Sequence, residues 1–312
     1  MQTDRRSLLK LLATSAAALP LLKTEELFAL QAAAPPPKLT LTPLTPNYQI
    51  LAGAGGNIGI LTSPDGTLII DTGLANTAPA VLAQIKSASK VPVRQVFNTH
   101  WHGDHVGANL DFAKEGATII AHENCRKRLA SKQHMDFMNR DVDPLPAPAL
   151  PTVLYRSEGT LFFGADPIDI HYVANAHTDN DMFLHFANAN IIQTGDLFFN
   201  GTYPFIDYST RGWIGGMVEG SEAILKMADA QTKIVPGHGP IGTPEDLRRS
   251  HDMLATIQQR IESARKQGKS LDETIAAKPT AEFDERFGKG FMNPDSFTKC
   301  VYKGLEAHEK AS

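Results

Sequence analysis

The chain has 312 residues, with 30 basic and 34 acidic side chains and a formal net charge of −4. Acidic and basic residues are mixed along the chain, so there is no electrostatic case for a nucleic-acid partner. The two cysteines, Cys125 and Cys300, are too few for a disulfide framework, and we expect two free buried thiols.

Residues 1–34 have the layout of an export signal. Arg5 and Arg6 precede a short apolar run, and small residues follow it near 32–34. This pattern predicts a twin-arginine signal peptide and a periplasmic protein, with no stable membrane anchor after cleavage. The alternative is a cytoplasmic protein with an amphipathic arm. Residues 35–47, which include three consecutive prolines, are predicted to be an extended linker.

The first half of the predicted domain alternates strands and helices. The turn signal SPDG at 63–66 predicts a hairpin between 58–62 and 67–71. A helix with Asn76 or Thr77 as its cap should follow. The further expected elements are a strand at 93–100, a helix at 107–116, a strand at 117–123, a helix at 123–132 and an irregular proline-rich loop at 140–152.

The second half begins with strands and ends with helices. Strands are expected at 159–163, 166–173, 181–187, 190–196 and 232–238, with a helix at 216–229. A long helix over 243–266 should start at Thr243, with Asp246 three residues later. We therefore predict one domain over 48–250 and a helical extension over 251–312 packed on it.

Three histidines and an aspartate crowd the segment from 100 to 105. His100 and His102 are separated by one residue as the chain leaves a strand, so their rings can point the same way. Asp104 and His105 are adjacent, so they diverge toward a second point. This pattern predicts two metal ions, which catalytic sites hold about 3.5–4 Å apart. Imidazole and carboxylate without thiolate favour zinc, with iron or manganese as alternatives.

Four ligands cannot complete two metal sites, so further ligands should come from downstream. The candidates are His177, Asp196 and His238. Each stands where an apolar run ends in a turn, which is where the edge of a sheet delivers side chains to a site.

The segments HWHGDH, AHT, TGD and PGHG, in this order, resemble the motifs of the metallo-β-lactamase superfamily. The resemblance implies an α/β fold, a four-layer αββα sandwich with the metals at one edge. It implies a first metal on His100, His102 and His177, and a second on Asp104, His105 and His238. Asp196 would bridge the two.

The same resemblance implies the chemistry of a binuclear zinc hydrolase. A hydroxide held by the metals would open an ester, thioester, lactone or amide of a small-molecule substrate, with Asp104 orienting it. Asp71, Thr99 and Asp181 are expected to support the ligands from behind. For Asp71 the alternative is an ordinary turn aspartate.

Several alternatives remain open at this point. Asp196 resembles the ligand of the glyoxalase II-like branch, whereas β-lactamases often have cysteine or serine nearby. A metallo-β-lactamase acting on antibiotics, a single-iron sulfur dioxygenase using His100, His177 and Asp196, and a non-catalytic periplasmic accessory protein are the rival functions. The loop after Asp196 carries four aromatic residues that either form a substrate wall or pack in the core: Tyr203, Phe205, Tyr208 and Trp213. The sequence does not predict the oligomeric state.

Overall fold

The computed structural model describes residues 38–164 and 166–311. The predicted signal peptide, 1–34, lies outside the described residues. The predicted linker, 35–47, lies partly outside them, and its residues Thr40–Pro43 form a strand that pairs in the first sheet. Among the described helices, none combines the length and the apolar character needed to cross a bilayer. The domain boundaries expected near 47 and 250 stay predictions.

Two sheets form the centre of the described chain. The first has seven strands, in the spatial order β1 (Thr40–Pro43), β2 (Tyr48–Ala52), β3 (Ile58–Ser63), β4 (Gly66–Ile70), β5 (Val93–Phe97), β6 (Thr118–His122) and β9 (Val153–Tyr155). Strands β1 to β4 are antiparallel, whereas β4, β5, β6 and β9 run parallel to one another.

The second sheet has five strands, in the order β10 (Gly159–Phe163), β11 (Asp166–Val173), β12 (Asp181–Phe186), β13 (Ile191–Gln193) and β14 (Lys233–Val235). Only its last pair, β13 and β14, is parallel. A separate small hairpin pairs β7 (Gln133–Met135) with β8 (Arg140–Val142).

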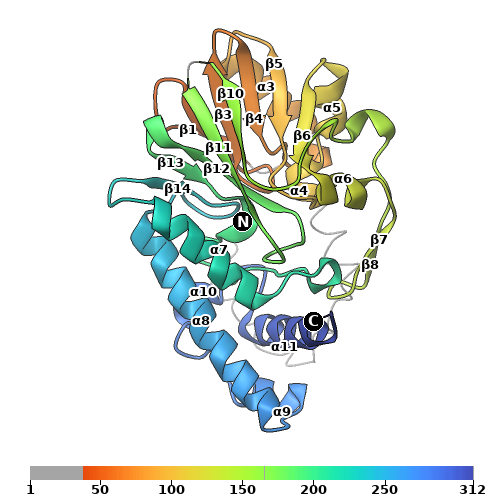
Figure 1. Ribbon diagram of the computed structural model, residues 1–312, viewed down its shortest axis with the longest axis vertical. Helices are drawn as coiled ribbons and strands as arrows, with labels where there is room; N and C mark the ends of the chain where they lie inside the picture. The colour runs from red at the N-terminus through yellow and green to blue at the C-terminus, as the bar shows by residue number, and fades with distance from the viewer. Residues whose placement is uncertain (1–37, 165, 312) are drawn as a thin grey trace, which may run out of the picture. The chain divides into compact units, whose positions relative to one another are not determined.

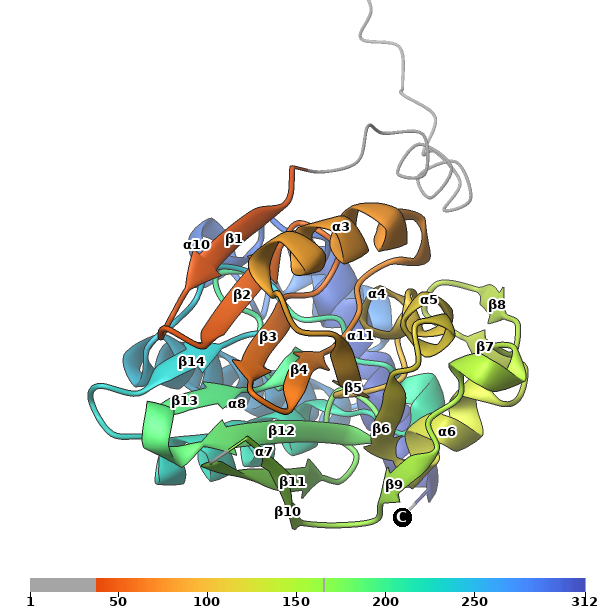
Figure 2. The ribbon, with the colours of Figure 1, turned by 90° about the horizontal axis from the view of Figure 1, so that it is seen from above.

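The α-helices differ in the layer that they cover. They are α3 (Ala78–Ala88), α4 (Gly103–Val106), α5 (Asn109–Lys114), α6 (Glu123–Leu129), α7 (Ile214–Met227), α8 (Pro244–Lys266), α9 (Leu271–Ala276), α10 (Asp284–Phe287) and α11 (Pro294–Ala311). Figure 2 shows α3 beyond the outer face of the first sheet, while Figure 1 shows α7, α8 and α11 on the side of the second sheet.

Strand periodicity explains why the layers stack. Successive side chains of a strand point to opposite faces, so a strand buried on both sides is apolar throughout. Leu68 and Ile70 of β4 face the second sheet, whereas Ile69 between them packs with Val81 of α3. On the far side of the second sheet, Ile192 packs in the cluster that includes the apolar residues of α7, α8 and α11. This order of helix, sheet, sheet and helix is the predicted αββα sandwich.

The local predictions were largely confirmed. The hairpin around SPDG forms, with Ser63 paired to Gly66. Thr243 and Asp246 form a reciprocal cap at the start of α8. Thr77 precedes α3, but its hydroxyl donates to the Leu74 carbonyl instead of capping the helix. The loop expected at 140–152 was wrong in part, because residues 140–142 pair with β7.

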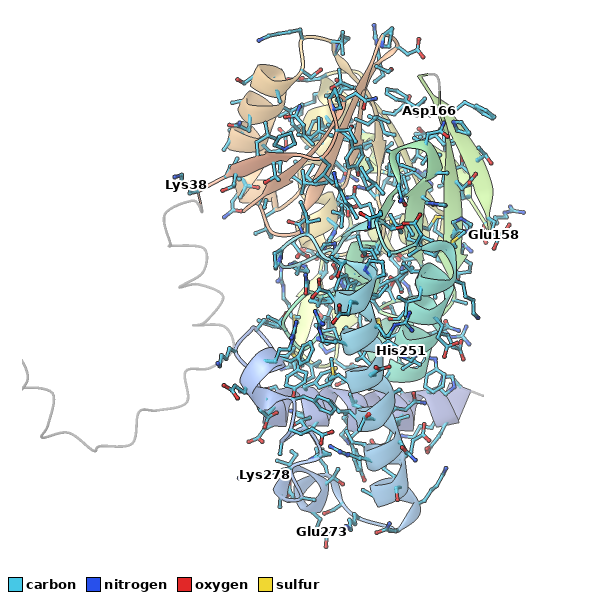
Figure 3. All side chains as sticks on the ribbon, turned by 90° about the vertical axis from the view of Figure 1, so that its left-hand side faces the viewer. Lys38, Glu158, Asp166, His251, Glu273 and Lys278 are labelled. Atoms are coloured by element: carbon cyan, nitrogen blue, oxygen red, sulfur yellow. The ribbon has the colours of Figure 1, made fainter. Side chains whose placement is uncertain are left out.

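Residues beyond 243 form a helical layer of their own. Figure 3 shows His251 along α8, with Glu273 of α9 and Lys278 at the end of this layer farthest from the sheets. Helix α11 packs against α8 and α9 and also meets the turn at Tyr208–Thr210, which follows the second sheet's β13. The C-terminal helices therefore lie beside a loop that returns to the edge of the sandwich.

Candidate metal centre

One edge of the sandwich collects the polar residues that follow its strands. Chain segments leave β4 at Asp71, β5 at His100 and β14 at His238, and Asp196 lies in the turn after β13. His177 precedes β12, which runs antiparallel to β13 and so begins at the same edge. Because parallel strands end together, residues far apart in the sequence meet here.

The structure brings all seven predicted ligands together. One group is His100, His102, His177 and Asp196, and a second is Asp104, His105 and His238. Within each group the donor atoms lie within 4.8 Å of one another. Both groups consist of imidazole nitrogens and carboxylate oxygens, which is the donor chemistry of zinc, iron or manganese sites.

Asp196 lies between the two groups. Its Oδ2 is 3.2 Å from His177 Nε2 and 3.4 Å from His238 Nε2. Its Oδ1 is 3.2 Å from His105 Nε2. One carboxylate therefore touches donors of both groups, which is the geometry that a bridging ligand needs.

Hydrogen bonds fix which nitrogen of each buried histidine faces the centre. His177 Nδ1 donates to the Phe205 carbonyl at 2.8 Å, which leaves Nε2 facing inward. His102 is turned the other way: its Nε2 lies 3.1 Å from Asp207 Oδ2, and its Nδ1 lies 2.8 Å from His177 Nε2. An acceptor behind each ring presents the opposite nitrogen's lone pair to a cation.

Asp71 supports two further histidines. Its Oδ2 accepts from His105 Nδ1 at 2.8 Å and from the Thr99 hydroxyl at 2.7 Å. The Thr99 oxygen is in turn 3.1 Å from His100 Nδ1, so that ring can donate to it. The Thr99 amide also donates to Asp71. The structure thus places Asp71 and Thr99 directly behind His105 and His100, two of the predicted ligands.

Two buried atoms at the centre have no hydrogen-bond partner among the described residues: His100 Nε2 and Asp196 Oδ1. Leaving a buried polar atom unpaired costs about 1–3 kcal/mol. Both atoms lie within the cluster of candidate metal-binding atoms. The Asp196 oxygen is an acceptor, and His100 Nε2 is also an acceptor when His100 carries its proton on Nδ1. Cations placed among these atoms would satisfy both, so the residues present fit a bound metal centre.

The two groups differ in their protonation without metal. Burial and the neighbouring His105 lower the pKa of His100, and burial lowers the pKa of His177 to about 4. For His238, burial also opposes protonation, but the Asp196 and Asp104 carboxylates outweigh it and raise the pKa to about 10. His105 likewise has a raised pKa, because carboxylates surround it. His100 and His177 of the first group are therefore neutral near pH 7, whereas His105 and His238 of the second group hold protons.

Glycines let the backbone approach the ligands closely. A Cβ at Gly237 would lie 1.9 Å from Asp196 Oδ1, and one at Gly56 would lie 2.4 Å from a carbon of the His105 ring. Any side chain at these positions would have to displace a ligand. The absence of a side chain at these glycines of the PGHG and AGGN segments therefore leaves the room that Asp196 and His105 occupy.

Asp181 supports the site less directly than expected. Its carboxylate accepts from the amide and the hydroxyl of Thr178, the residue after His177, at 2.8 and 2.6 Å. Burial raises its pKa to about 7. Asp181 therefore fixes the loop that carries His177 through its two hydrogen bonds with Thr178.

Sequence reasoning missed Asp207, the acceptor behind His102. It is buried and also accepts from the Thr210 hydroxyl at 2.8 Å. The only available signal was indirect: a metal-binding histidine needs an acceptor on its second nitrogen. No spacing rule connects Asp207 to His102, 105 residues earlier.

The four aromatic residues after Asp196 have different surroundings. Phe205 lies beside the ligands, with ring centroids 5.7 Å from His102 and 6.0 Å from His177. Tyr203 stacks on Phe297, and Trp213 stacks on His308 of α11. Of these side chains, Phe205 is the one placed to form a wall of the centre.

Comparisons with known proteins agree with this geometry. A family model described as the metallo-beta-lactamase superfamily matches residues 52–256. A metallo-beta-lactamase from Pontibacter korlensis has a TM-score of 0.58 at 18% identity, covering 70% of this chain and 99% of its own. The DIM-1 metallo-beta-lactamase has a TM-score of 0.56 at 17% identity, covering 70% and 98%.

A second kind of neighbour extends further along the chain. A stereoselective inverting sec-alkylsulfatase from a Pseudomonas species has a TM-score of 0.65 at 17% identity. The match covers 88% of this chain and 52% of the sulfatase chain, so this chain spans about half of that neighbour. At such identities the likeness shows the shared fold alone.

Proposed function

Because this chain belongs to the metallo-beta-lactamase superfamily, we propose that it is a binuclear zinc hydrolase that opens an ester, thioester, lactone or amide bond. The observation that carries the proposal is the position of Asp196, which lies 3.2 Å from His177 Nε2 of the first group and 3.2 Å from His105 Nε2 of the second. A single carboxylate shared by two donor groups is suited to hold two cations close together.

His100, His102 and His177 would hold the first ion, Asp104, His105 and His238 the second, and Asp196 both. Bound there, the ions would supply positive charge that polarises a carbonyl and lowers the pKa of water. The chain's own contribution is to hold the imidazole rings in the orientation that ligation needs. Four groups do this by accepting hydrogen bonds from the outer ring nitrogens or by relaying them: Asp71, Thr99, Asp207 and the Phe205 carbonyl.

Asp104 has the additional task of orienting the attacking water. Its side chain is 29% exposed, whereas that of Asp196 is only 4% exposed. Asp104 Oδ2 lies 3.2 Å from His238 Nε2, so one carboxylate oxygen is held by a ligand. The exposed part of the group can then accept a hydrogen bond from water beside the substrate. Proton acceptance of this kind typically contributes 10²–10⁴-fold to a rate.

A β-lactamase activity is the second candidate, because two of the neighbouring folds are β-lactamases. Among the ion pairs of the described residues, those of the site carboxylates involve histidines, with no lysine or arginine. A β-lactam's carboxylate would therefore meet no lysine or arginine that is paired with the site carboxylates. We expect weak lactam turnover, below that of a simple thioester or aryl ester.

The test is a side-by-side assay on zinc-loaded protein. The substrates are an aryl ester, a lactone, a glutathione thioester, a carbapenem, a cephalosporin and a secondary alkyl sulfate, with Asp104→Ala as the blank. We expect ester or thioester hydrolysis that Asp104→Ala reduces at least about 100-fold. Efficient carbapenem hydrolysis lost in that variant would replace the proposal with the β-lactamase function.

Metal analysis separates the remaining alternatives. Two zinc ions per chain favour hydrolysis. One iron per chain, with sulfur oxidation, would favour the single-iron dioxygenase. A filled site without activity on any substrate would favour the accessory protein.

We also propose export by the twin-arginine route, on the basis of Arg5 and Arg6 before the apolar run. Cargo of this route folds before it crosses the membrane, which suits a protein whose metal ligands come from distant segments. Replacing both arginines by lysine should leave the precursor in the cytoplasm in a fractionation experiment. Mature protein still found in the periplasm would contradict this route.

A further inference from the structure

Two residues of the cluster are clearly more exposed than the others. The side chains of Asp104 and His238 are 29% and 28% exposed, that of His102 is 8% exposed, and those of His100, His105 and His177 are 0–1% exposed. A substrate can therefore reach the cluster at Asp104 and His238. The residues around these two determine which substrates fit.

Apolar side chains surround this exposed side. Phe199 stacks on His238, with centroids 4.9 Å apart and 20° between the ring planes. Leu74 is 36% exposed. Gly55 lies between Leu74 and Asp104: a Cβ built on it would be 3.1 Å from Leu74 Cγ and 2.8 Å from Asp104 Cβ. Apolar groups beside a polar site favour a ligand with an apolar part.

A line of aromatic rings leads outward from the first metal group. The Phe205 centroid is 5.7 Å from that of His102, and the half-buried Phe137 is 5.7 Å from Phe205. Phe137 follows β7 in the small hairpin, and the neighbouring amide of Asp136 donates to Ser209 Oγ at 2.8 Å. The hairpin is thereby attached to the loop that carries Phe205 and Asp207.

A lysine stands at the outer end of this line. Lys299 Nζ lies 5.8 Å from the centroid of Phe137, within the range of a cation–π contact. Lys299 is exposed on α11, and it forms no ion pair with any carboxylate of residues 38–164 and 166–311. By contrast Lys303, one turn later, lies 2.9 Å from Glu306. Lys299 thus keeps its charge available for a ligand.

We propose that Phe137 and Lys299 form the outer part of the substrate site and select esters or thioesters whose apolar acyl chain ends in a carboxylate. This inference rests on the proposed hydrolase function and names its substrate class. The reacting carbonyl would lie at Asp104 and His238. The acyl chain would follow Phe205 and Phe137, and its far end would pair with Lys299.

The first test compares two p-nitrophenyl esters that differ only in a terminal carboxylate, the monoester of suberic acid and the ester of octanoic acid. Lys299→Gln should raise KM for the suberyl ester about threefold to tenfold, with kcat nearly unchanged, since an exposed charge pair contributes modestly. KM for the octanoyl ester should stay within twofold. Lys303→Gln, the matched control on the same helix, should change neither value.

The second test measures binding without catalysis. The probes are 1-anilinonaphthalene-8-sulfonate and its neutral analogue N-phenyl-1-naphthylamine, titrated by fluorescence on metal-free protein. Lys299→Gln should weaken the sulfonate about threefold to tenfold and leave the neutral probe unchanged. Phe137→Leu should weaken both.

The two tests separate the possible failures. If no ester is hydrolysed but Lys299→Gln weakens only the anionic probe, the hydrolase function fails and the outer site stands. Equal effects of Lys299→Gln and Lys303→Gln, or no effect of Lys299→Gln in either test, would overturn the role of Lys299.

Discussion

The two donor groups of the centre are built on different physical terms. His100, His102 and His177 are nearly fully buried, and each has an oxygen atom behind its outer nitrogen. Asp104 and His238 are about a quarter exposed and rely mainly on each other and on Asp196. The first group is therefore enclosed by the protein, whereas Asp104 and His238 place the second group at an open edge of the centre.

Protonation follows from this difference. Burial lowers the pKa of His100 and that of His177, the latter to about 4. Carboxylates around the second group raise the pKa of His238 to about 10. Near pH 7 a cation entering the first group displaces no proton from His100 or His177, whereas one entering the second must displace the proton of His238. The first ion should therefore bind more tightly and stay longer.

The largest effect should come from Asp196, because it touches both groups. Asp196→Ala removes a shared ligand and leaves the buried His100, His105 and His177 without their carboxylate. We expect loss of both ions and a fall in hydrolysis of at least about 10³-fold. Elemental analysis of the purified variant checks this. Full occupancy in Asp196→Ala would rule out bridging.

The next effect separates the two groups. His238→Ala should lose mainly the second ion and keep the first, since His238 serves only the open edge. Its matched counterpart, His177→Ala, should empty the first group. Metal content should fall from about two to about one per chain in His238→Ala. Equal loss of both ions would mean that the groups do not bind independently.

A smaller effect should come from Asp207, which lies 3.1 Å from His102 Nε2. Asp207→Asn keeps the shape but weakens the acceptor behind the ring. Loss of such a partner typically costs about 10- to 100-fold in metal affinity. Competition titration with a chelator measures it, with the exposed Asp136→Asn as control. An unchanged affinity would remove Asp207 from the support of the centre.

The effect of pH should differ between the groups. Below pH 10 a cation must displace the proton of His238, so affinity at the second group should rise with pH, by up to about tenfold per unit for each proton released. His177 loses its proton near pH 4 and the pKa of His100 is also lowered, so affinity at the first group should vary much less with pH above pH 6. Chelator titrations at pH 6.5, 7.5 and 8.5 would show one sloping and one flat component. Two equal slopes would contradict the assignment.

The sequence predicted the parts that depend on local pattern. The turn at SPDG, the cap at Thr243 and the strand ends that carry His100 and His238 all follow from a few neighbouring residues. The four motifs also located side chains that the fold brings together, while their roles as ligands stay predictions.

Other features depend on long crossings of the chain, which no local pattern records. Asp207 meets His102 across 105 residues, and Lys299 reaches Phe137 from a helix near the C-terminus. The β7–β8 hairpin was missed because strands of only three residues carry little periodicity. These long-range contacts are the features of the centre that the sequence motifs alone did not predict.

The central claim is that two ions act together in one hydrolytic centre. Its most direct test is to strip the protein of metal and follow thioester or aryl ester hydrolysis as zinc is added in measured equivalents. We expect little activity up to about one equivalent, while the buried group fills, and a rise that ends at about two. Activity that is complete at one equivalent, or absent at two, would contradict the account.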